Sequence, residues 1–253
     1  MKASHFAAAA AIALAAGVFA ASAAGSIPAN IAAAVANPNR PQADRDRVAA
    51  RKPAEVLAFV KVKPGEQVLE LIPGGGYFTR VLSGAVGPKG HVTEAVPQRG
   101  GGDVRQTSNG VAADPNFANV SEMPFTPEAV GKAGPVDLVF TAQNYHDLHL
   151  SRLNLDVVGL DKQIYAALKP GGIFFIEDHA AAAGTGSDVS GAADKLHRID
   201  EDFVKKEVES VGFKLERESN ILRNPADDHS LLVFNPAIRG HTDQFLLVFR
   251  KPK

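Results

Sequence analysis

Imidazole and carboxylate groups occur side by side directly after two apolar segments of this 253-residue chain. His146-Asp147 follows one apolar segment, and Asp178-His179 follows directly after the next. Such groups can remove a proton from a substrate near neutral pH, or they can supply nitrogen and oxygen ligands to a divalent metal. We expect the first chemistry, in which His146 is the base or orients the acceptor, Asp178 is its nearest partner, and no metal is tightly held.

Several further histidines lie in connecting segments rather than in predicted strands or helices. They are His149, His197, His229 and His241. The last two belong to the stretch 219–242, which is longer than an ordinary connection and is typical of a functional loop or lid. We expect all these segments at or near one edge of a sheet. The alternative is that each histidine is only solvated or caps a turn.

The second motif with chemical meaning is Gly74-Gly75-Gly76, between the apolar run 67–72 and a helical pattern. Glycines allow a ligand to approach the backbone, and the first turn of a helix offers free N–H groups. As a dinucleotide fingerprint the motif is incomplete, because Thr79 stands where the third glycine belongs, and this disfavours NAD-linked reduction. No Gly-Lys-Ser/Thr follows, which excludes a P-loop, and no Gly-x-Ser-x-Gly occurs to mark a hydrolase nucleophile.

Strand-like and helix-like segments alternate from Lys63 onward, and they must position these motifs. The expected strands are 67–72, 91–96, 119–123, 136–141, 173–177, 214–218 and 244–251. The expected helices are 77–85, 156–168 and one that begins after Asp200. Repeated β-α-β units predict one doubly wound, mostly parallel sheet with helices on both faces. In such sheets ligands bind beyond the carboxyl ends of the strands.

The first 24 residues have the pattern of a secretory signal peptide. Lys2 gives a positive start, the run 6–21 is uncharged and rich in alanine, and Ala21-Ser22-Ala23 supplies the small residues of a cleavage site. We expect cleavage near Ala23 or Ala24, a periplasmic or secreted protein, and no stable membrane anchor afterwards.

Residues 25–60 precede the alternating pattern. The part up to residue 42 is rich in Ala, Asn and Pro, so we expect a loose arm with one or two helical turns. Residues 44–60 are helical in pattern, and Pro53 makes two helices or one kinked helix equally compatible with it. Residues 61–253 are expected to form one domain.

The composition excludes several classes of protein. Lys and Arg number 27 against 28 Asp and Glu, a net charge of −1, and no long basic run occurs. Neither a nucleic-acid surface nor a membrane-surface patch is therefore indicated. The chain has no cysteine, which excludes disulfides, a thiolate nucleophile and cysteine-ligated metals. A small molecule is the expected partner, and the oligomeric state is left open.

Four segments resemble motifs of the class I S-adenosylmethionine-dependent methyltransferases. Residues 68–76 are similar to the family's acid-x-Gly-x-Gly-x-Gly, with Ile72 in place of the first glycine, and 119–125 are similar to Asp-Ala-x-x-Leu-Pro-Phe. The third segment, 137–148, resembles the fourth-strand motif, and the most specific, 168–178, matches Leu-Lys-Pro-Gly-Gly and the strand after it. The nearest subgroup is the predicted exported methyltransferases, which share 144–147, 196–200 and 223–229.

The resemblance implies a Rossmann-like α/β fold with strand order 3-2-1-4-5-7-6 and an antiparallel seventh strand. It implies S-adenosylmethionine as cofactor and Asn119 near the adenine. The other expected cofactor-binding residues are Glu70, Gly74, Gly75, Gly76 and Tyr77. The expected substrate-binding residues are Asn144, Tyr145, Asp147, His179 and His229.

This chain departs from the family at the end of its second strand. The family has an acid there that holds the ribose hydroxyls, but the position is Val96 here. Glu94 lies two residues earlier on the same strand face. Either a shifted strand brings Glu94 to the ribose or the ribose acid is missing, and the alternative is that Glu94 is an ordinary edge residue.

The function implied by the resemblance is methyl transfer from S-adenosylmethionine to an unidentified small molecule. An exported enzyme would lie outside the cytosol, where this cofactor is made. That keeps a second class open, a methyltransferase-like scaffold that binds a small molecule or acts as a metal-assisted hydrolase.

Overall fold

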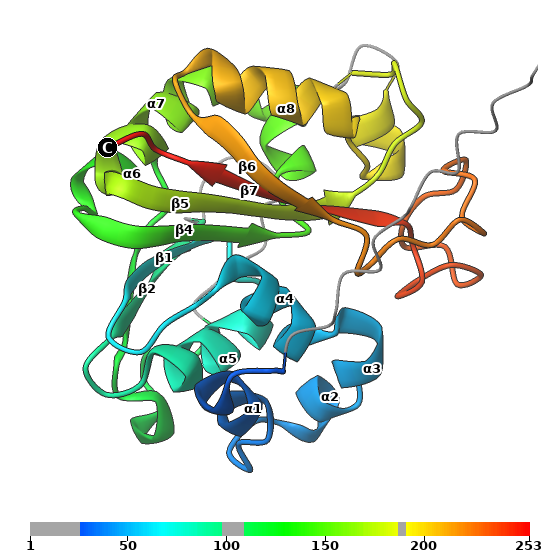
Figure 1. Cartoon of the computed structure of the whole chain (residues 1–253). Coiled ribbons are helices and arrows are strands. Elements are labelled where there is room, and N and C mark those ends of the chain that lie inside the picture. Colours follow the sequence, from blue (N-terminus) through cyan, green and yellow to red (C-terminus); the bar gives the residue numbers. More distant parts are fainter. Residues whose placement is uncertain (1–25, 98–108, 187–190) are drawn as a thin grey trace, which may run out of the picture.

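The computed structural model describes residues 26–97, 109–186 and 191–253. The predicted signal peptide, 1–24, lies outside these residues. The described chain forms three layers, a central twisted sheet with helices on both faces (Figure 1). Among the described residues, no helix is long and apolar enough to cross a membrane.

The sheet has seven strands in the order β3-β2-β1-β4-β5-β7-β6. They are β1 (Gln67–Leu71), β2 (His91–Val96), β3 (Val120–Pro124), β4 (Val136–Ala142), β5 (Leu168–His179), β6 (Lys214–Ser219) and β7 (Gln244–Arg250). β7 runs antiparallel to β5 and β6, while the other neighbours are parallel. The expected fold class, strand order and orientation of the seventh strand are confirmed.

The helices divide between the two faces (Figure 1). One face carries α1 (Ala29–Val35), α4 (Pro53–Val60) and α5 (Tyr77–Val86), and the other carries α6 (Pro127–Lys132), α7 (Val157–Ala167) and α8 (Glu201–Ser210). Side chains of β5 alternate between the two cores, since Phe175 packs with the first group and Phe174 with the second. A strand covered on both faces reads as a continuous apolar run, which is why the pattern of β5 is so clear.

The N-terminal segment is better ordered than the sequence predicts. In α1, Ile31 is fully buried, and the Asn30 amide donates to the carbonyl of Ala85 in α5. The arm that we expect to be loose is therefore packed on the domain. Further along, three short helices, α2 (Gln42–Arg45), α3 (Val48–Arg51) and α4, replace the expected one or two. The chain breaks at Lys52 (φ 41°), because a residue before proline is disfavoured in the helical region.

The carboxyl ends of β1, β4 and β5 and the amino end of β7 meet at one edge of the sheet. The loop 220–243, drawn in orange and red in Figure 1, lies at this edge, with α2 and α3 below it. Three short turns complete the edge and its surroundings: η2 (His146–His149), η3 (Ser151–Leu153) and the π-helical turn η4 (Ala192–Leu196). A fourth, η1 (Pro115–Phe117), precedes β3.

Candidate functional site

His146 and Asp178 form a buried pair at the ends of β4 and β5. The Nδ1 of His146 lies 2.7 Å from Oδ1 of Asp178, and its backbone N–H donates to Oδ2 at 2.6 Å. The His179 backbone N–H also donates to this carboxylate, at 2.7 Å. Because β4 and β5 are neighbouring parallel strands, the residues that follow them meet, as the sequence predicts.

The other nitrogen of His146 faces two further groups. Nε2 lies 3.3 Å from Oδ1 of Asp147 and 3.2 Å from Nδ1 of His197. These last two atoms are 3.2 Å from each other. His197 follows the π-helical turn η4 and has φ 52°. We call His146, Asp147, Asp178 and His197 the His146 cluster.

Charge in this cluster is balanced between imidazole and carboxylate. Burial lowers the pKa of His146, but Asp178 and Asp147 outweigh it and raise the pKa to about 10. Burial raises the pKa of Asp147, yet His146 and His197 outweigh it and hold the pKa below its ordinary value. At neutral pH His146 is therefore an imidazolium between two carboxylates. The His146 imidazolium can orient both carboxylates. It can accept a proton from a substrate only after it has lost its own ring proton.

His179 lies beside the cluster but in a different electrostatic state. Its ring centroid is 5.8 Å from that of His146, and its Nδ1 is 2.7 Å from the hydroxyl oxygen of Thr242. Burial lowers the pKa of His179 to about 3, so the ring is neutral at all ordinary pH values. Among the expected substrate-binding residues, His179 and Asp147 are the two that the structure brings next to His146.

Tyr145 lies on the opposite side of the same turn. It is fully buried, and its hydroxyl is 2.8 Å from Oδ2 of Asp161 and 2.9 Å from Oε1 of Glu207. His149 joins it there, with Nε2 2.8 Å from the same oxygen of Glu207. Residues 145 and 149 are four apart in this turn, so both side chains point toward α7 and α8 and away from His146. In this structure the Tyr145 hydroxyl faces Asp161 and Glu207 and not the His146 cluster.

Asn144 and His229 also make structural contacts. The Asn144 amide donates to the carbonyls of Ile72 (2.9 Å) and Ala142 (2.7 Å), which fastens the end of β1 to the end of β4. His229 has φ 65° and places Nε2 3.1 Å from Oδ2 of Asp243, within the loop 220–243. Both residues lie at the expected edge, but neither belongs to the His146 cluster.

The glycine turn after β1 adopts left-handed backbone at three positions. Gly74 has φ 60° and Gly76 φ 74°, and Gly76 begins α5. Ile72, which stands where the methyltransferase motif has its first glycine, has φ 51°. For a β-branched residue this conformation is strained. A Cβ on Gly76 would lie 2.5 Å from Cγ2 of Val111, so the chain that crosses the turn at 109–111 requires glycine there.

Two carboxyl groups share one hydroxyl behind this turn. The Oγ1 of Thr79 lies 2.6 Å from Oε2 of Glu70 and 2.7 Å from Oε1 of Glu94. A hydroxyl has one proton to donate, so the second contact requires a protonated carboxyl group as donor. Burial raises the pKa of Glu70 to about 8 and raises that of Glu94 as well. Glu70 therefore carries the proton at pH 7.

Glu94 is not an edge residue in this structure. It is fully buried, and the Asn109 amide donates to its Oε1 at 2.6 Å. It pairs in register with Glu70, and the strand ends at Val96 without an acid. Among the described residues, β2 itself has no carboxylate at its ligand-facing end. Its buried Oε2 has no hydrogen-bond partner among the described residues.

Arginines of the N-terminal segment surround Tyr77, and sequence reasoning missed them. The guanidinium carbons of Arg40, Arg47 and Arg51 lie 5.3, 4.9 and 4.6 Å from the centre of the Tyr77 ring. Arg51 also reaches Glu177, with Nη2 3.7 Å from Oε1. The available signal was four arginines in twelve residues (Arg40, Arg45, Arg47 and Arg51), in a segment that reads as an arm rather than as part of a site.

Several buried polar atoms around Tyr77 have no hydrogen-bond partner among the described residues. They are Nε and Nη2 of Arg40, Nε of Arg51, the Tyr77 hydroxyl and Oε2 of Glu177. Burial raises the pKa of Glu177 to about 7 against the attraction of Arg51. Unpaired buried groups usually mark a place where a ligand or ordered water supplies the missing partner. Here they offer donors to an anion and an acceptor to a cation.

A cavity of about 590 Å³ opens between α3 and the loop 220–243. Its lining includes Lys52, Asn224, His241, Thr242 and Gln244. The cavity borders the His146 cluster, because Thr242 contacts His179. It also borders the groups around Tyr77, because Gln244 accepts from the Gln143 amide, which also donates to Glu177. A volume of this size accommodates a small molecule.

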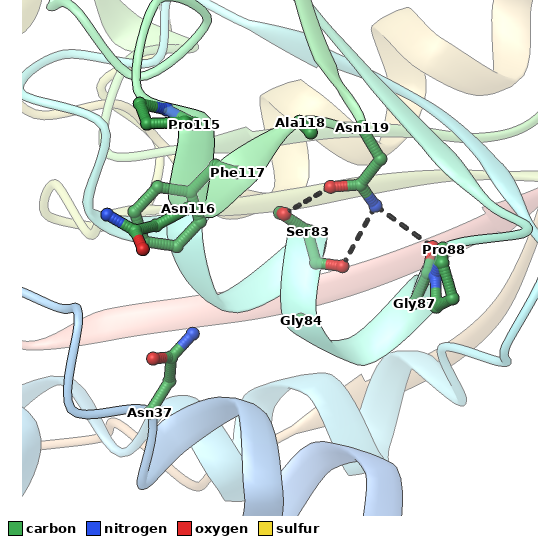
Figure 2. Close-up of a pocket in the computed structure, with 10 residues that line it drawn as sticks. All are labelled: Asn37, Ser83, Gly84, Gly87, Pro88, Pro115, Asn116, Phe117, Ala118 and Asn119. Carbon is green, nitrogen blue, oxygen red and sulfur yellow. Dashed lines mark hydrogen bonds between the residues drawn. The ribbon is translucent and has the colours of Figure 1, made fainter.

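Asn119 lies at the amino end of β3, on the side of the sheet opposite to the His146 cluster. This position corrects its expected place near adenine. Figure 2 shows its side chain over the last turn of α5, where the amide donates to the carbonyls of Ser83 (3.1 Å) and Gly87 (3.0 Å). These residues line a cavity of about 430 Å³. The methyltransferase-like segment forms the strand β3 itself, so Asn119 precedes the strand instead of ending it.

No protein-family model matches this sequence, and no curated protein matches it. Solved structures do resemble the fold. A SAM-dependent methyltransferase from Aquifex aeolicus has a TM-score of 0.54 at 17% identity, covering 84% of this chain and 98% of its own. An arsenic(III) S-adenosylmethionine methyltransferase from Chlamydomonas reinhardtii has 0.51 at 18%, covering 90% and 75%. The [4+2]-cyclase SpnF has 0.56 at 15%, covering 88% and 91%.

These similarities establish that the chain has the class I methyltransferase fold. Identities below 20% carry the fold and no more, and the cyclase illustrates that one fold can support different chemistry. The function must therefore be argued from the residues of the site.

Proposed function

We propose that this protein transfers a methyl group from S-adenosylmethionine to a small molecule. The observation that carries the proposal is the set of unpaired buried groups beside the glycine turn. S-adenosylmethionine ends in a free amino acid, with one carboxylate and one ammonium group. A site for that end needs fixed cationic donors and an acidic acceptor close to the turn.

The residues beside Tyr77 fit this amino-acid end. Arg40 and Arg51 have buried guanidinium N–H groups free among the described residues to bind a carboxylate, and Oε2 of Glu177 is free to accept from an ammonium group. The first turn of α5 adds the positive end of a helix. At the ribose end the fit is weaker, because Val96 offers no acceptor to the hydroxyls. We therefore expect the cofactor to bind, but less tightly than where that acid is present.

The His146 cluster would hold the methyl acceptor. When bound, the cofactor supplies the methyl group, and the protein must align the acceptor with it and manage the acceptor's proton. Asp178 fixes His146, so we assign His146 the orienting role. Asp147 and His197 are the members that solvent reaches, with side chains 31% and 22% exposed. The adjoining cavity reaches this part of the site through Thr242, which contacts His179.

Export of the protein is a further part of this proposal. It rests on the alanine-rich run 6–21 and on Ala21-Ser22-Ala23. N-terminal sequencing of the protein recovered from an expressing bacterium tests it. A first residue at Ala24 or Gly25 in the periplasmic fraction is expected, and a cytosolic chain that retains Met1 would contradict it.

Calorimetric titration with S-adenosylmethionine and S-adenosylhomocysteine tests the cofactor directly. Both ligands are expected to bind with one site per chain, since both contain the same amino-acid end. Inosine, which lacks that end, serves as the control and should not bind. If neither cofactor form binds, methyl transfer is excluded and the scaffold alternative takes its place.

A further inference from the structure

We propose that His146, Asp147 and His197 bind one divalent transition metal ion, with Zn²⁺ the best fit. The inference concerns metal binding itself and does not depend on the proposed methyl transfer. It replaces the expectation from sequence that no metal is tightly held.

The first argument is the spacing of the three ligand atoms. Nε2 of His146, Nδ1 of His197 and Oδ1 of Asp147 form a nearly equilateral triangle with sides of 3.2, 3.2 and 3.3 Å. A tetrahedral zinc ion with bonds of about 2.0–2.1 Å holds its ligand atoms about 3.3 Å apart. The three atoms thus have the spacing of three corners of a zinc tetrahedron.

The second argument is the support behind His146. A metal-binding histidine commonly donates its other ring N–H to a carboxylate, which fixes the tautomer and the orientation of the ring. Asp178 does this at 2.7 Å, and two backbone N–H groups hold its carboxylate in turn. A buried carboxylate in this position also balances the charge of a bound cation.

The type and exposure of the ligands point to a transition metal with an open coordination position. Two imidazoles and one carboxylate suit Zn²⁺ and its neighbours, whereas Ca²⁺ and Mg²⁺ prefer oxygen ligands. The side chain of His146 is 3% exposed, while those of His197 and Asp147 are 22% and 31% exposed. The fourth corner therefore faces solvent, as in catalytic rather than structural zinc sites.

His197 is fixed by its own surroundings and not by the metal alone. Its ring centroid lies 4.9 Å from that of Phe234, and the turn η4 before it has both alanines buried. A prearranged ligand loses little conformational freedom on binding. In the metal-loaded protein, Nε2 of His146 is a ligand and not a base.

Cobalt titration of the full chain tests the site. The protein is prepared without a histidine tag, stripped with EDTA and titrated with Co²⁺, whose visible absorption reports tetrahedral coordination, and then with Zn²⁺. One Co²⁺ per chain that Zn²⁺ displaces is expected. His197→Ala and Asp147→Asn should each weaken binding by at least about 10-fold, and Asp178→Asn by about 10- to 100-fold.

His229→Ala is the matched control, because His229 also pairs with an aspartate, at 3.1 Å, but contacts no second histidine in the described part of the chain. It should bind Co²⁺ as the unmodified chain does. Asp147→Asn keeps the shape of the side chain, so it provides the comparison if His197→Ala does not fold. Absence of binding at millimolar Co²⁺, or equal binding by all variants, would overturn the proposal. Failure of the cofactor titration would leave this result unaffected.

Discussion

The glycine turn and the His146 cluster lie at the same edge of one sheet, yet their carboxyl groups behave in opposite ways. Glu70 and Glu177 are buried beside the turn, and burial raises their pKa values to about 8 and about 7. Asp147 is half-buried, and two imidazoles hold its pKa below the ordinary value. Burial and the partner within hydrogen-bond distance together decide whether an acid at this edge is ionised.

The two regions should therefore bind different ligands. Beside the glycine turn, neutral or half-ionised acids and unpaired arginine N–H groups can bind a zwitterionic ligand. In the His146 cluster the carboxyl groups already pair with histidines, so this region should bind a cation rather than accept a further proton. The predictions that follow test each side of this comparison, beginning with the largest expected effect.

Replacing Asp178 with alanine should destabilise the protein by about 3–5 kcal/mol, because the His146 imidazolium would stay buried without its partner. Two backbone N–H groups would lose their acceptor as well. Urea unfolding of the metal-free protein at pH 7 measures the change. A loss under about 1 kcal/mol would show that His146 is neutral in the folded state.

Glu70→Gln tests the opposite case through pH. The folded-state pKa of about 8 exceeds the ordinary value of 4.5, so the native state binds the extra proton, and its stability falls as pH rises from 4.5 to 8. Glutamine resembles the protonated acid but does not titrate, so the variant should lack this part of the pH dependence of stability. Between pH 6 and pH 8 the unmodified protein should lose on the order of 2 kcal/mol more than the variant. Urea midpoints at both pH values give the difference, and parallel curves would refute the neutral Glu70.

The sequence predicted the sheet better than the site. Strands such as β5 are covered on both faces, so their apolar runs are unmistakable, and the meeting of His146 with Asp178 follows from strands that are neighbours. His197 was expected near this edge, but its contact with His146, 51 residues away in sequence, could not be predicted, because it depends on the π-helical turn that precedes His197. Asn119 was misplaced because the motif-like segment proved to be the strand itself.

The arginines around Tyr77 were missed for a related reason. They belong to helices of four residues and the turns between them, which produce no amphipathic period. Glu94 was located on the right strand face, but only the three-dimensional structure shows that this face turns inward to Thr79. Local patterns thus predict elements, while contacts between short, irregular segments depend on the packing of the whole domain.

Within the glycine turn, Gly76→Ala and Gly75→Ala form a matched pair. An alanine at 76 would need φ 74° and would place its Cβ 2.5 Å from Val111, so about 2 kcal/mol of stability should be lost. At Gly75 a Cβ meets nothing within 4 Å, and the stability should be nearly unchanged. Thermal unfolding distinguishes the two. Equal losses would mean that the crossing of the turn by 109–111 is not tight.

The smallest expected effect separates ligand binding from packing around Tyr77. Arg51 and Arg47 both lie over its ring, at 4.6 and 4.9 Å, but Arg51 has an unpaired buried Nε whereas Arg47 is half exposed and bonded to Asp44. Arg51→Ala should weaken S-adenosylmethionine binding about 10-fold, the loss of one charge-assisted hydrogen bond. Arg47→Ala should leave the affinity within about 2-fold, because its guanidinium stacks on Tyr77 and is already bonded to Asp44.

His146→Ala completes this set of variants. It alters the His146 cluster and not the groups around Tyr77, so it should leave cofactor affinity nearly unchanged. Calorimetric titration of the three variants gives the dissociation constants, and urea unfolding confirms that each is folded. A loss in Arg47→Ala as large as in Arg51→Ala would mean that the arginines act through the shape of the N-terminal segment. A large loss in His146→Ala would mean that the two halves of the edge bind one ligand together, and the division of the site proposed here would fail.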